Sequence, residues 1–311
     1  MKKYSKEKAE FFRELSNFAN SIGKIISKDD KWTIKGFIDI FKNIYSISND
    51  TKIISKVLEI QIFPYLITFA EKIGYNLELA THQNWYPDLT FISKTNEDIK
   101  FAVDLKTTYK DDKRDVFCNG FTLGSHGEYF INRNSTKNIQ YSYNEYSGHF
   151  CIGVIYSRNI LDESENLKIY NLECLEQIPD VIGDFIFFAQ EKWKMASDKP
   201  GSGNTANIGS IKNIEDIIKG EGVFAKAGED IFDDYWSNYG RLQVKDKNNN
   251  RKALSSFEEY IRYRGLSDKI NNSKMRRKRW KNERKNTCSS DKNTGNKNKT
   301  CSFNKRQHYN G

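Results

Sequence analysis

Two short β-type runs, residues 86–92 and 100–106, constrain the fold more than any other feature of the chain. The polar segment SKTNEDI lies between them and has a composition typical of a hairpin loop. If the hairpin is symmetric about Asn96, then Asp88 and Asp104 are cross-strand partners on one face, with Cβ atoms about 4.5–5.5 Å apart. The sheet built around this hairpin must therefore accommodate two facing carboxylates.

The second run also distinguishes Asp104 from the other Asp-x-Lys matches in the chain. In FAVDLKT the apolar side chains alternate, so a strand there turns them into a core and presents Asp104 and Lys106 together on the opposite face. The competing matches lie in polar, turn-like stretches, at Asp29–Lys31, Asp98–Lys100 and Asp111–Lys113. The alternation therefore favours Asp104 and Lys106 as the functional pair.

Facing carboxylates repel each other unless a cation lies between them, and Mg²⁺ prefers such oxygen ligands. Lys106 adds a positive charge on the same face. A metal beside a lysine suits phosphodiester hydrolysis, because the metal activates water and the lysine offsets charge on the phosphate. The same spacing also fits a surface hairpin with an acid–lysine ladder, and spacing alone leaves both interpretations open.

Hydrophobic periodicity predicts how the rest of the chain is organised. Helices are expected at 5–28, 52–73, 211–219, 228–239 and 255–263, and further strands at 127–132, 150–156 and 184–194. Pro64 should kink or divide the second helix, which Gly74 ends. The order of helices, strands and helices predicts an α/β fold with a central mixed sheet flanked by helices.

Charge is distributed unevenly along the chain. Residues 266–311 hold 14 of the 50 basic residues but only 3 of the 41 acidic ones, which leaves residues 1–265 close to neutral. The domain over 1–267 would therefore need locally placed groups to bind a polyanion. The segment 268–311 is a basic low-complexity tail that we expect to be disordered, because it has too few apolar residues to offset its ordering entropy.

No signal peptide is apparent after the basic N-terminus, and no run of about 18 apolar residues is expected to span a membrane. The chain is therefore expected to be cytoplasmic. Its five cysteines include no C-x-x-C pair, which argues against both a disulfide framework and a zinc site.

The segment GSGNTANIGS at 201–210 has two interpretations. It lacks the G-K-[ST] ending of a phosphate-binding loop, and its composition is typical of a flexible linker. It would also suit a DNA-recognition loop, because Asn204 could bond adenine bidentately and the Thr205 methyl group could contact thymine.

Several of these segments together give the chain a family resemblance from about Thr51 to Gly265. In order along the chain they include TKIISKVLE, AEKIGY, QNWYPD, AVDLKTTY, FTLG, TKNI, EKW and GSGNTANIGS. This set resembles the EcoRV-type type II restriction endonucleases of the PD-(D/E)xK nuclease superfamily. His82 and Trp85 depart from the family pattern beside Gln-Asn, and Ala206 departs from it in the loop.

The resemblance implies roles for individual residues. Asp88 and Asp104 would be Mg²⁺ ligands and Lys106 the catalytic lysine. Glu59 would be an auxiliary catalytic and metal-binding acid, although it could equally be an exposed glutamate paired with Lys56. The implied DNA-binding residues are Gly201, Ser202, Gly203, Asn204, Thr205 and Asn207 in the loop, Gln83 and Asn84 in the minor groove, and Lys137 and Arg241 on phosphates.

The resemblance also implies the reaction and its partners. We expect Mg²⁺-dependent hydrolysis of double-stranded DNA at GATATC, with a central blunt cut that leaves 5′-phosphates. A homodimer astride the palindrome is expected, with residues 1–50 in the dimerisation region, and a cognate methyltransferase would protect host DNA. The alternatives are a structure-specific repair or junction nuclease on the same fold, and a non-catalytic DNA-binding protein that uses the basic tail.

Overall fold

The structure, a computed structural model, describes residues 4–159, 168–201, 205–246 and 249–266. The chain divides after Arg264 into two units, and the description below concerns the first. The basic tail at 268–311 and the loop positions 202–204 lie outside the described residues.

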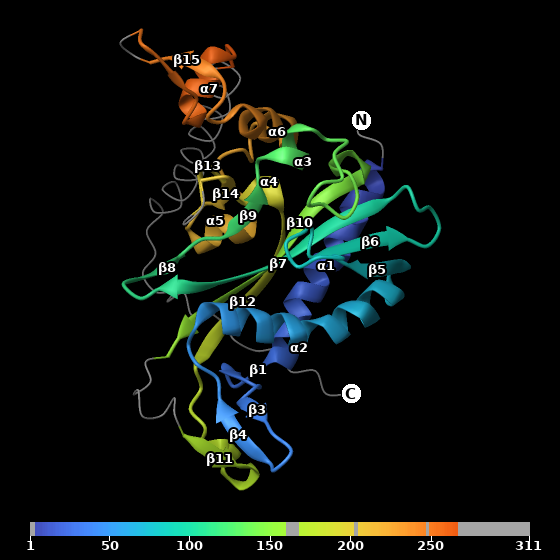
Figure 1. The fold of residues 1–311 in the computed structure, drawn as a ribbon, viewed down its shortest axis with the longest axis vertical. Helices are drawn as coiled ribbons and strands as arrows, with labels where there is room; N and C mark the ends of the chain where they lie inside the picture. The colour runs from blue at the N-terminus through green and yellow to red at the C-terminus, as the bar shows by residue number, and fades with distance from the viewer. Residues whose placement is uncertain (1–3, 160–167, 202–204, 247–248, 267–311) are drawn as a thin grey trace, which may run out of the picture. The chain divides into compact units, whose positions relative to one another are not determined.

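A mixed β-sheet forms the centre of this unit (Figure 1). Its strand order is β1-β2-β12-β10-β7-β6-β5, with β8 pairing to β7. β10 runs parallel to β7, and the other pairs are antiparallel, so the predicted mixed sheet is confirmed. The strands are β1 (Ser27–Lys28), β2 (Lys31–Trp32), β5 (Tyr75–Leu79), β6 (Leu89–Ser93), β7 (Lys100–Asp111), β8 (Arg114–Cys118), β10 (Tyr146–Arg158) and β12 (Ile182–Glu191).

The predicted hairpin is the pair β6–β7. Leu89 pairs with Val103 and Thr90 pairs with Ala102, a register centred on residue 96 as expected. The alternating apolar side chains of β7 lie in the core. The opposite face is covered as well, because Asp104 is only 3% exposed. The alternative of a surface hairpin is therefore wrong.

Two long helices, α1 (Ser5–Ile26) and α2 (Thr51–Lys72), contribute to the same hydrophobic core as the sheet. α1 buries Phe11 and Leu15 at the spacing of one helical face, and the Phe11 ring stacks on Phe101 of β7 at 4.3 Å between centroids. Asp50 is the N-cap of α2, and its Oδ1 accepts hydrogen bonds from the Lys52 and Ile53 amides. The sequence pattern therefore predicted both helices correctly.

α2 differs from the sequence expectations in two ways. Pro64 does not divide it, because burial of Ile62 and Leu66 on either side outweighs the lost backbone hydrogen bond, while a kink at Pro64 stays a prediction. By length and composition α2 could also cross a membrane, although no segment was expected to be apolar enough. It packs in the core through Ile54 and Leu58, as the core helix of a globular unit does.

Three smaller sheets lie around the central one. They are β11–β4–β3, β13–β14–β9 and β15–β16. Their bounds are β3 (Gly36–Ile38), β4 (Asn43–Ser46), β9 (Thr122–Ser125), β11 (Ile169–Asn171), β13 (Ala196–Pro200), β14 (Asn207–Ser210), β15 (Gln243–Lys245) and β16 (Arg251–Ala253). β14 pairs with β9, which places Asn207 opposite Ser125.

The remaining helices are short. The three expected in the C-terminal third are confirmed as α5 (Ile214–Lys219), α6 (Glu229–Asn238) and α7 (Phe257–Tyr263). The strand expected at 127–132 is wrong: α3 (Glu128–Ile131) forms there, because the Gly127 carbonyl accepts the Phe130 and Ile131 amides. The strand expected at 184–194 ends at Glu191, where α4 (Lys192–Met195) begins. Within the described residues, 3₁₀ turns lie at Tyr143–Glu145 and Leu172–Gln177.

Candidate active site

Asp88 and Asp104 are held together by hydrogen bonds across the β6–β7 hairpin. The Asp88 amide donates to Asp104 Oδ1 at 3.1 Å, and the Leu105 amide donates to Asp88 Oδ2 at 2.9 Å. Each carboxylate therefore accepts a backbone N–H from the other strand. This reciprocal arrangement fixes both groups before any ligand arrives, because neither can turn away without losing its hydrogen bond.

Lys106 lies between the two carboxylates. Its Nζ is 3.3 Å from Asp88 Oδ2 and 3.2 Å from Asp104 Oδ2. Burial, together with the charge of Asp104, raises the pKa of Asp88, while Lys106 opposes that rise. Burial alone would lower the pKa of Lys106, but the two carboxylates raise it above its usual value. The lysine therefore stays protonated at neutral pH and screens the two anions from each other.

The carboxylate pair fits a divalent metal ion. Mg²⁺ is commonly bound by one or two carboxylates and completes its coordination with water and substrate phosphate. Asp88 and Asp104 line an open pocket of about 480 Å³, which leaves room for those other ligands. Among residues 4–159, 168–201, 205–246 and 249–266, no group of three His, Cys, Asp or Glu side chains is placed to hold a metal. Asp88 and Asp104 are therefore the residues of this pocket that could hold such an ion.

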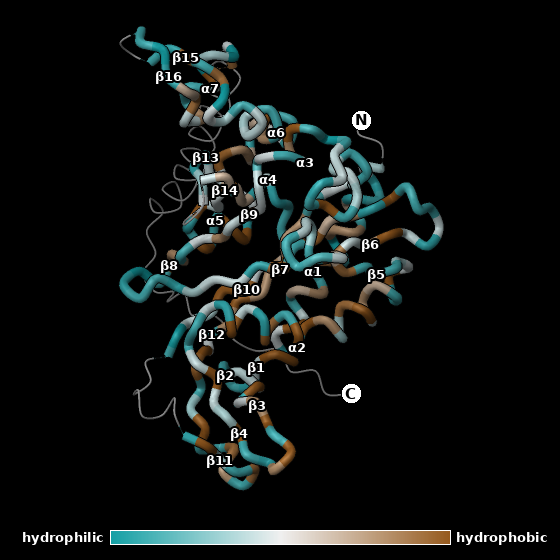
Figure 2. The backbone as a smooth tube through the Cα atoms, in the orientation of Figure 1, coloured by the Kyte–Doolittle hydropathy of each residue, from teal (hydrophilic) through white to brown (hydrophobic). Residues whose placement is uncertain are grey.

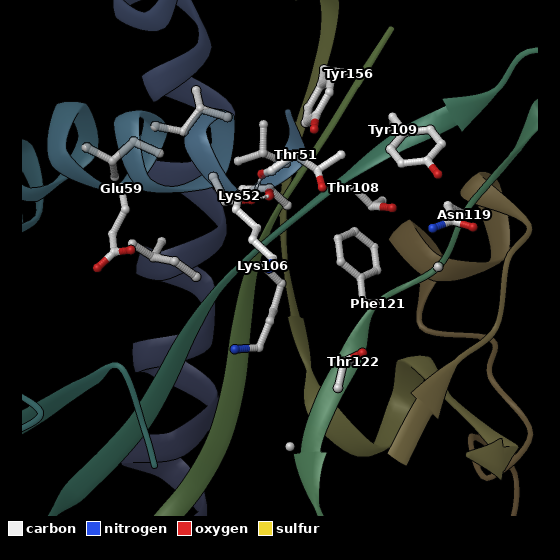
Figure 3. A pocket seen from close by; sticks show the side chains of 18 of the residues that line it. Thr51, Lys52, Glu59, Lys106, Thr108, Tyr109, Asn119, Phe121, Thr122 and Tyr156 are labelled. Atoms are coloured by element: carbon white, nitrogen blue, oxygen red, sulfur yellow. Dashed lines mark hydrogen bonds between the residues drawn. The ribbon is translucent and has the colours of Figure 1, made fainter. Parts of the chain in front are cut away.

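A second pocket of about 550 Å³ adjoins the first (Figure 3). It is lined by the start of α2 and by the second half of β7. Phe121, just before β9, and Thr122, the first residue of β9, line it from another side. The two pockets share Lys106, Gly124 and Asn207. Together they form one groove, and Lys106, which lines both pockets, lies where they meet.

Glu59 lines the second pocket from α2, across from Lys106 (Figure 3). Its Oε2 is 2.7 Å from the Nζ of Lys56, the pairing that would also suit an exposed helical glutamate. The structure does not gather Glu59 with Asp88 and Asp104 into one cluster of acids within the described ranges. A catalytic or metal-binding role for Glu59 stays a prediction.

Several predicted DNA-binding residues lie around the same groove. Gln83 and Asn84 line the pocket of the carboxylates, and so does Asn207 of β14. At the base of the 201–210 loop, the Gly201 amide donates to the Asn207 carbonyl at 2.8 Å. Thr205 is exposed in a turn. Ser202, Gly203 and Asn204 lie outside the described residues.

The two predicted phosphate contacts do not line either pocket. Lys137 is exposed, and its Nζ lies 3.4 Å from Oε2 of Glu128. The Arg241 guanidinium donates to the carbonyl oxygens of Ser237 and His126, at 3.0 and 3.2 Å. Both roles stay predictions.

One charged group near the site, Lys192, lies in the EKW segment of the family resemblance but was given no role from the sequence. Lys192 is 1% exposed, and its Nζ lies 4.5 Å from the centroid of the Tyr86 ring, which lines the pocket of the carboxylates. Its Nζ has no hydrogen-bond partner in the described part of the chain. Burial lowers the pKa of Lys192 to about 8, although the charge of Asp104 opposes the shift. Sequence reasoning missed it because a lysine at the end of a strand is usually exposed.

Lys192 should make stability depend on pH in a distinctive way. Between pH about 8 and 10.5 the unfolded chain keeps a proton that the folded chain has released, so the free energy of unfolding rises with pH. Lys192→Met should remove a rise of up to about 1.4 kcal/mol per pH unit, measured by urea unfolding across this range. The exposed Lys24→Met variant is the control and should follow the wild type. Equal slopes for Lys192→Met and wild type would contradict the assignment.

Comparison with known proteins shows the family of the chain. The family model described as restriction endonuclease EcoRV matches residues 28–265. The type II restriction enzyme EcoRV of Escherichia coli is 38% identical over 247 residues, which cover 78% of this chain and 96% of that protein. The matched region contains the carboxylate hairpin, Lys106 and the 201–210 loop. The chain therefore belongs to the EcoRV family of type II restriction endonucleases.

Proposed function

We propose that the protein is a Mg²⁺-dependent endonuclease that hydrolyses double-stranded DNA at GATATC. It would cut at the centre of the site and leave blunt ends with 5′-phosphates. The observation that carries the proposal is the position of Lys106 Nζ, 3.3 and 3.2 Å from the two carboxylates of an open pocket. Family membership supports the restriction activity, and the loop sequence supports the choice of site.

The residues of the site would divide the chemistry between them. Asp88 and Asp104 would hold Mg²⁺, which polarises the scissile phosphate and activates water when it is bound. Lys106 would offset the negative charge that develops on the phosphate and orient the attacking water. Water forms the new bond to phosphorus and the P–O3′ bond breaks, so the phosphate stays on the 5′ end.

The 201–210 loop supports recognition of a defined sequence. Its stem residue Asn207 lies in β14 and lines the pocket of the carboxylates, so a loop built on this stem would reach bases close to the cut. Asn204 would bond adenine and Thr205 would contact the thymine methyl group. A structure-specific repair or junction nuclease would have no use for such a loop.

A homodimer is supported by an exposed apolar surface. On and near β3, β4 and β11 the exposed apolar side chains are Phe37, Ile38, Ile40, Phe41, Tyr45 and Ile169, of which Ile40 is 90% exposed. Figure 2 shows apolar stretches along this sheet. We propose that a second copy of the chain covers it, because a palindromic site requires two related subunits and an apolar patch of this kind marks an interface.

The remaining parts of the proposal concern the cellular setting. The protein would act in the cytoplasm, beside a methyltransferase that protects host sites. The basic tail, outside the described residues, would add sequence-independent affinity for phosphates. A DNA-binding protein without catalysis is disfavoured, because two partly buried carboxylates beside a phosphate backbone would only weaken binding.

Replacing a catalytic residue should abolish cleavage without unfolding the protein. We expect Asp104→Asn and Lys106→Ala to lower the rate by at least about a thousandfold, since each loses several kcal/mol of transition-state stabilisation. The assay is cleavage of a plasmid with one GATATC, with and without Mg²⁺. Asp98→Asn, from a competing Asp-x-Lys match, is the control and should cut normally. Rapid cutting by Asp104→Asn would place the active site elsewhere.

Sequence specificity can be tested on the ends of digested genomic DNA. Sequencing should recover blunt ends that bisect GATATC, and a site that differs by one base pair should resist cutting, since each lost base contact costs about 1–3 kcal/mol. Asn204→Ala should lose most cognate cleavage but keep weak non-specific binding. Ends that map to another hexamer would refute the proposed site.

The apolar surface should control the oligomeric state. Phe41 is 77% exposed, and Phe41→Asp should weaken the dimer by at least about a hundredfold, because the carboxylate loses the gain from burying the ring and must itself be desolvated. Sedimentation velocity would measure the change. Val116→Asp, on exposed β8, is the matched control and should leave the dimer intact. A monomeric wild type would exclude this interface.

A further inference from the structure

His126 joins two segments that the proposed function assigns to DNA binding. It follows β9, and it is 7% exposed. Its amide donates to the Ala206 carbonyl at 3.0 Å, and its Nε2 lies 3.0 Å from the Thr205 carbonyl. The backbone and the side chain of one residue therefore hold two consecutive carbonyls of the recognition loop.

The contacts of the His126 ring fix its protonation. A carbonyl only accepts hydrogen bonds, so Nε2 must carry the proton that is shared with Thr205. Nδ1 is buried without a partner in the described part of the chain, which suits a neutral ring. Burial lowers the pKa of His126, and the nearby Arg241 charge acts in the same direction. The imidazole is therefore a neutral donor aimed at the loop.

Arg241 contacts the same residue from the other side. Its guanidinium donates to the His126 carbonyl at 3.2 Å, while the His126 ring packs against Trp236 and Tyr239, with centroids 5.1 and 5.6 Å away. Arg241 is a predicted phosphate contact and Thr205 a predicted base contact. His126 joins them, because its carbonyl accepts from Arg241 and its ring donates to Thr205. Arg241 and the loop stem are therefore both in hydrogen-bond contact with His126.

We propose that His126 is a positioning residue for base recognition, which holds the Thr205–Asn207 stem in register with β9 and connects it to Arg241. The inference deepens the proposed function and rests on it, since it assumes that the loop reads bases. It assigns to His126 no contact with DNA or with the reacting atoms. The requirement is a donor at the Nε2 position, and an aromatic ring without a donor is not sufficient.

Two substitutions separate the donor from the ring. His126→Phe keeps the aromatic packing on Trp236 and removes the donor, while His126→Gln keeps an N–H at similar reach and removes the ring. We expect His126→Phe to lower the ratio of kcat/KM on the preferred site to that on a one-base-pair variant by about five- to tenfold, the effect of one hydrogen bond. His126→Gln should restore most of that ratio.

Hydrogen–deuterium exchange of the DNA-free enzyme gives a readout that does not depend on cleavage. Peptides covering Thr205–Asn207 should exchange faster in His126→Phe than in wild type or His126→Gln, while peptides of β7 stay unchanged. The inference is overturned if His126→Phe keeps both discrimination and protection, or if both variants lose them equally, which would indicate packing alone. If the wild-type enzyme prefers a site other than GATATC, the proposed recognition site is wrong. The role of His126 is still decided by the kcat/KM ratio measured on that other site and by hydrogen–deuterium exchange of Thr205–Asn207.

Discussion

Two carboxylates placed within one hairpin, with a lysine ammonium between them, set the conditions for the rest of the site. Like charges so close would oppose folding if nothing compensated them. Lys106 does so from the same strand, at 3.2–3.3 Å from both groups. The pair also accepts two backbone amides across the hairpin, so geometry and charge are fixed by the same few residues. A divalent ion bound as proposed would therefore meet two carboxylates that are already in place.

The position of β7 within the sheet explains how such a charged group is tolerated. The strand lies between β6 and β10, and its apolar side chains anchor it in the core with α1 and α2. Asp104 lies on the other face, where Tyr86 and Tyr129 line the pocket and exclude part of the solvent. A low local dielectric strengthens every charge interaction there. The buried ammonium of Lys192 beside Tyr86 belongs to the same environment.

Local pattern predicted the centre of the fold well. The symmetry of the loop about Asn96 gave the register of β6–β7, because a short hairpin is determined by neighbouring residues. Features that depend on distant packing could not be predicted. Pro64 remains inside α2 because its neighbours are buried, and the 127–132 segment turns into α3 on the Gly127 carbonyl. The family resemblance supplied Glu59, Lys137 and Arg241, but Lys192 and His126 needed the structure, since neither the burial of Lys192 within EKW nor the contacts of His126 can be read from neighbouring residues.

The strand pairings also determine whether the β6–β7 hairpin or the β14 stem of the 201–210 loop can form first during folding. Asp88, Asp104 and Lys106 lie within one hairpin and need only contacts that are close in sequence. The loop stem in β14 pairs with β9, some eighty residues earlier in the chain, roughly the distance between Ser125 and Asn207. Contacts of such separation are slow to form, because loop closure must precede them. A newly made chain would therefore assemble Asp88, Asp104 and Lys106 before the loop stem at Asn207, and a mutation that delays β9–β14 pairing would prolong the interval in which the hairpin is formed and the stem is not.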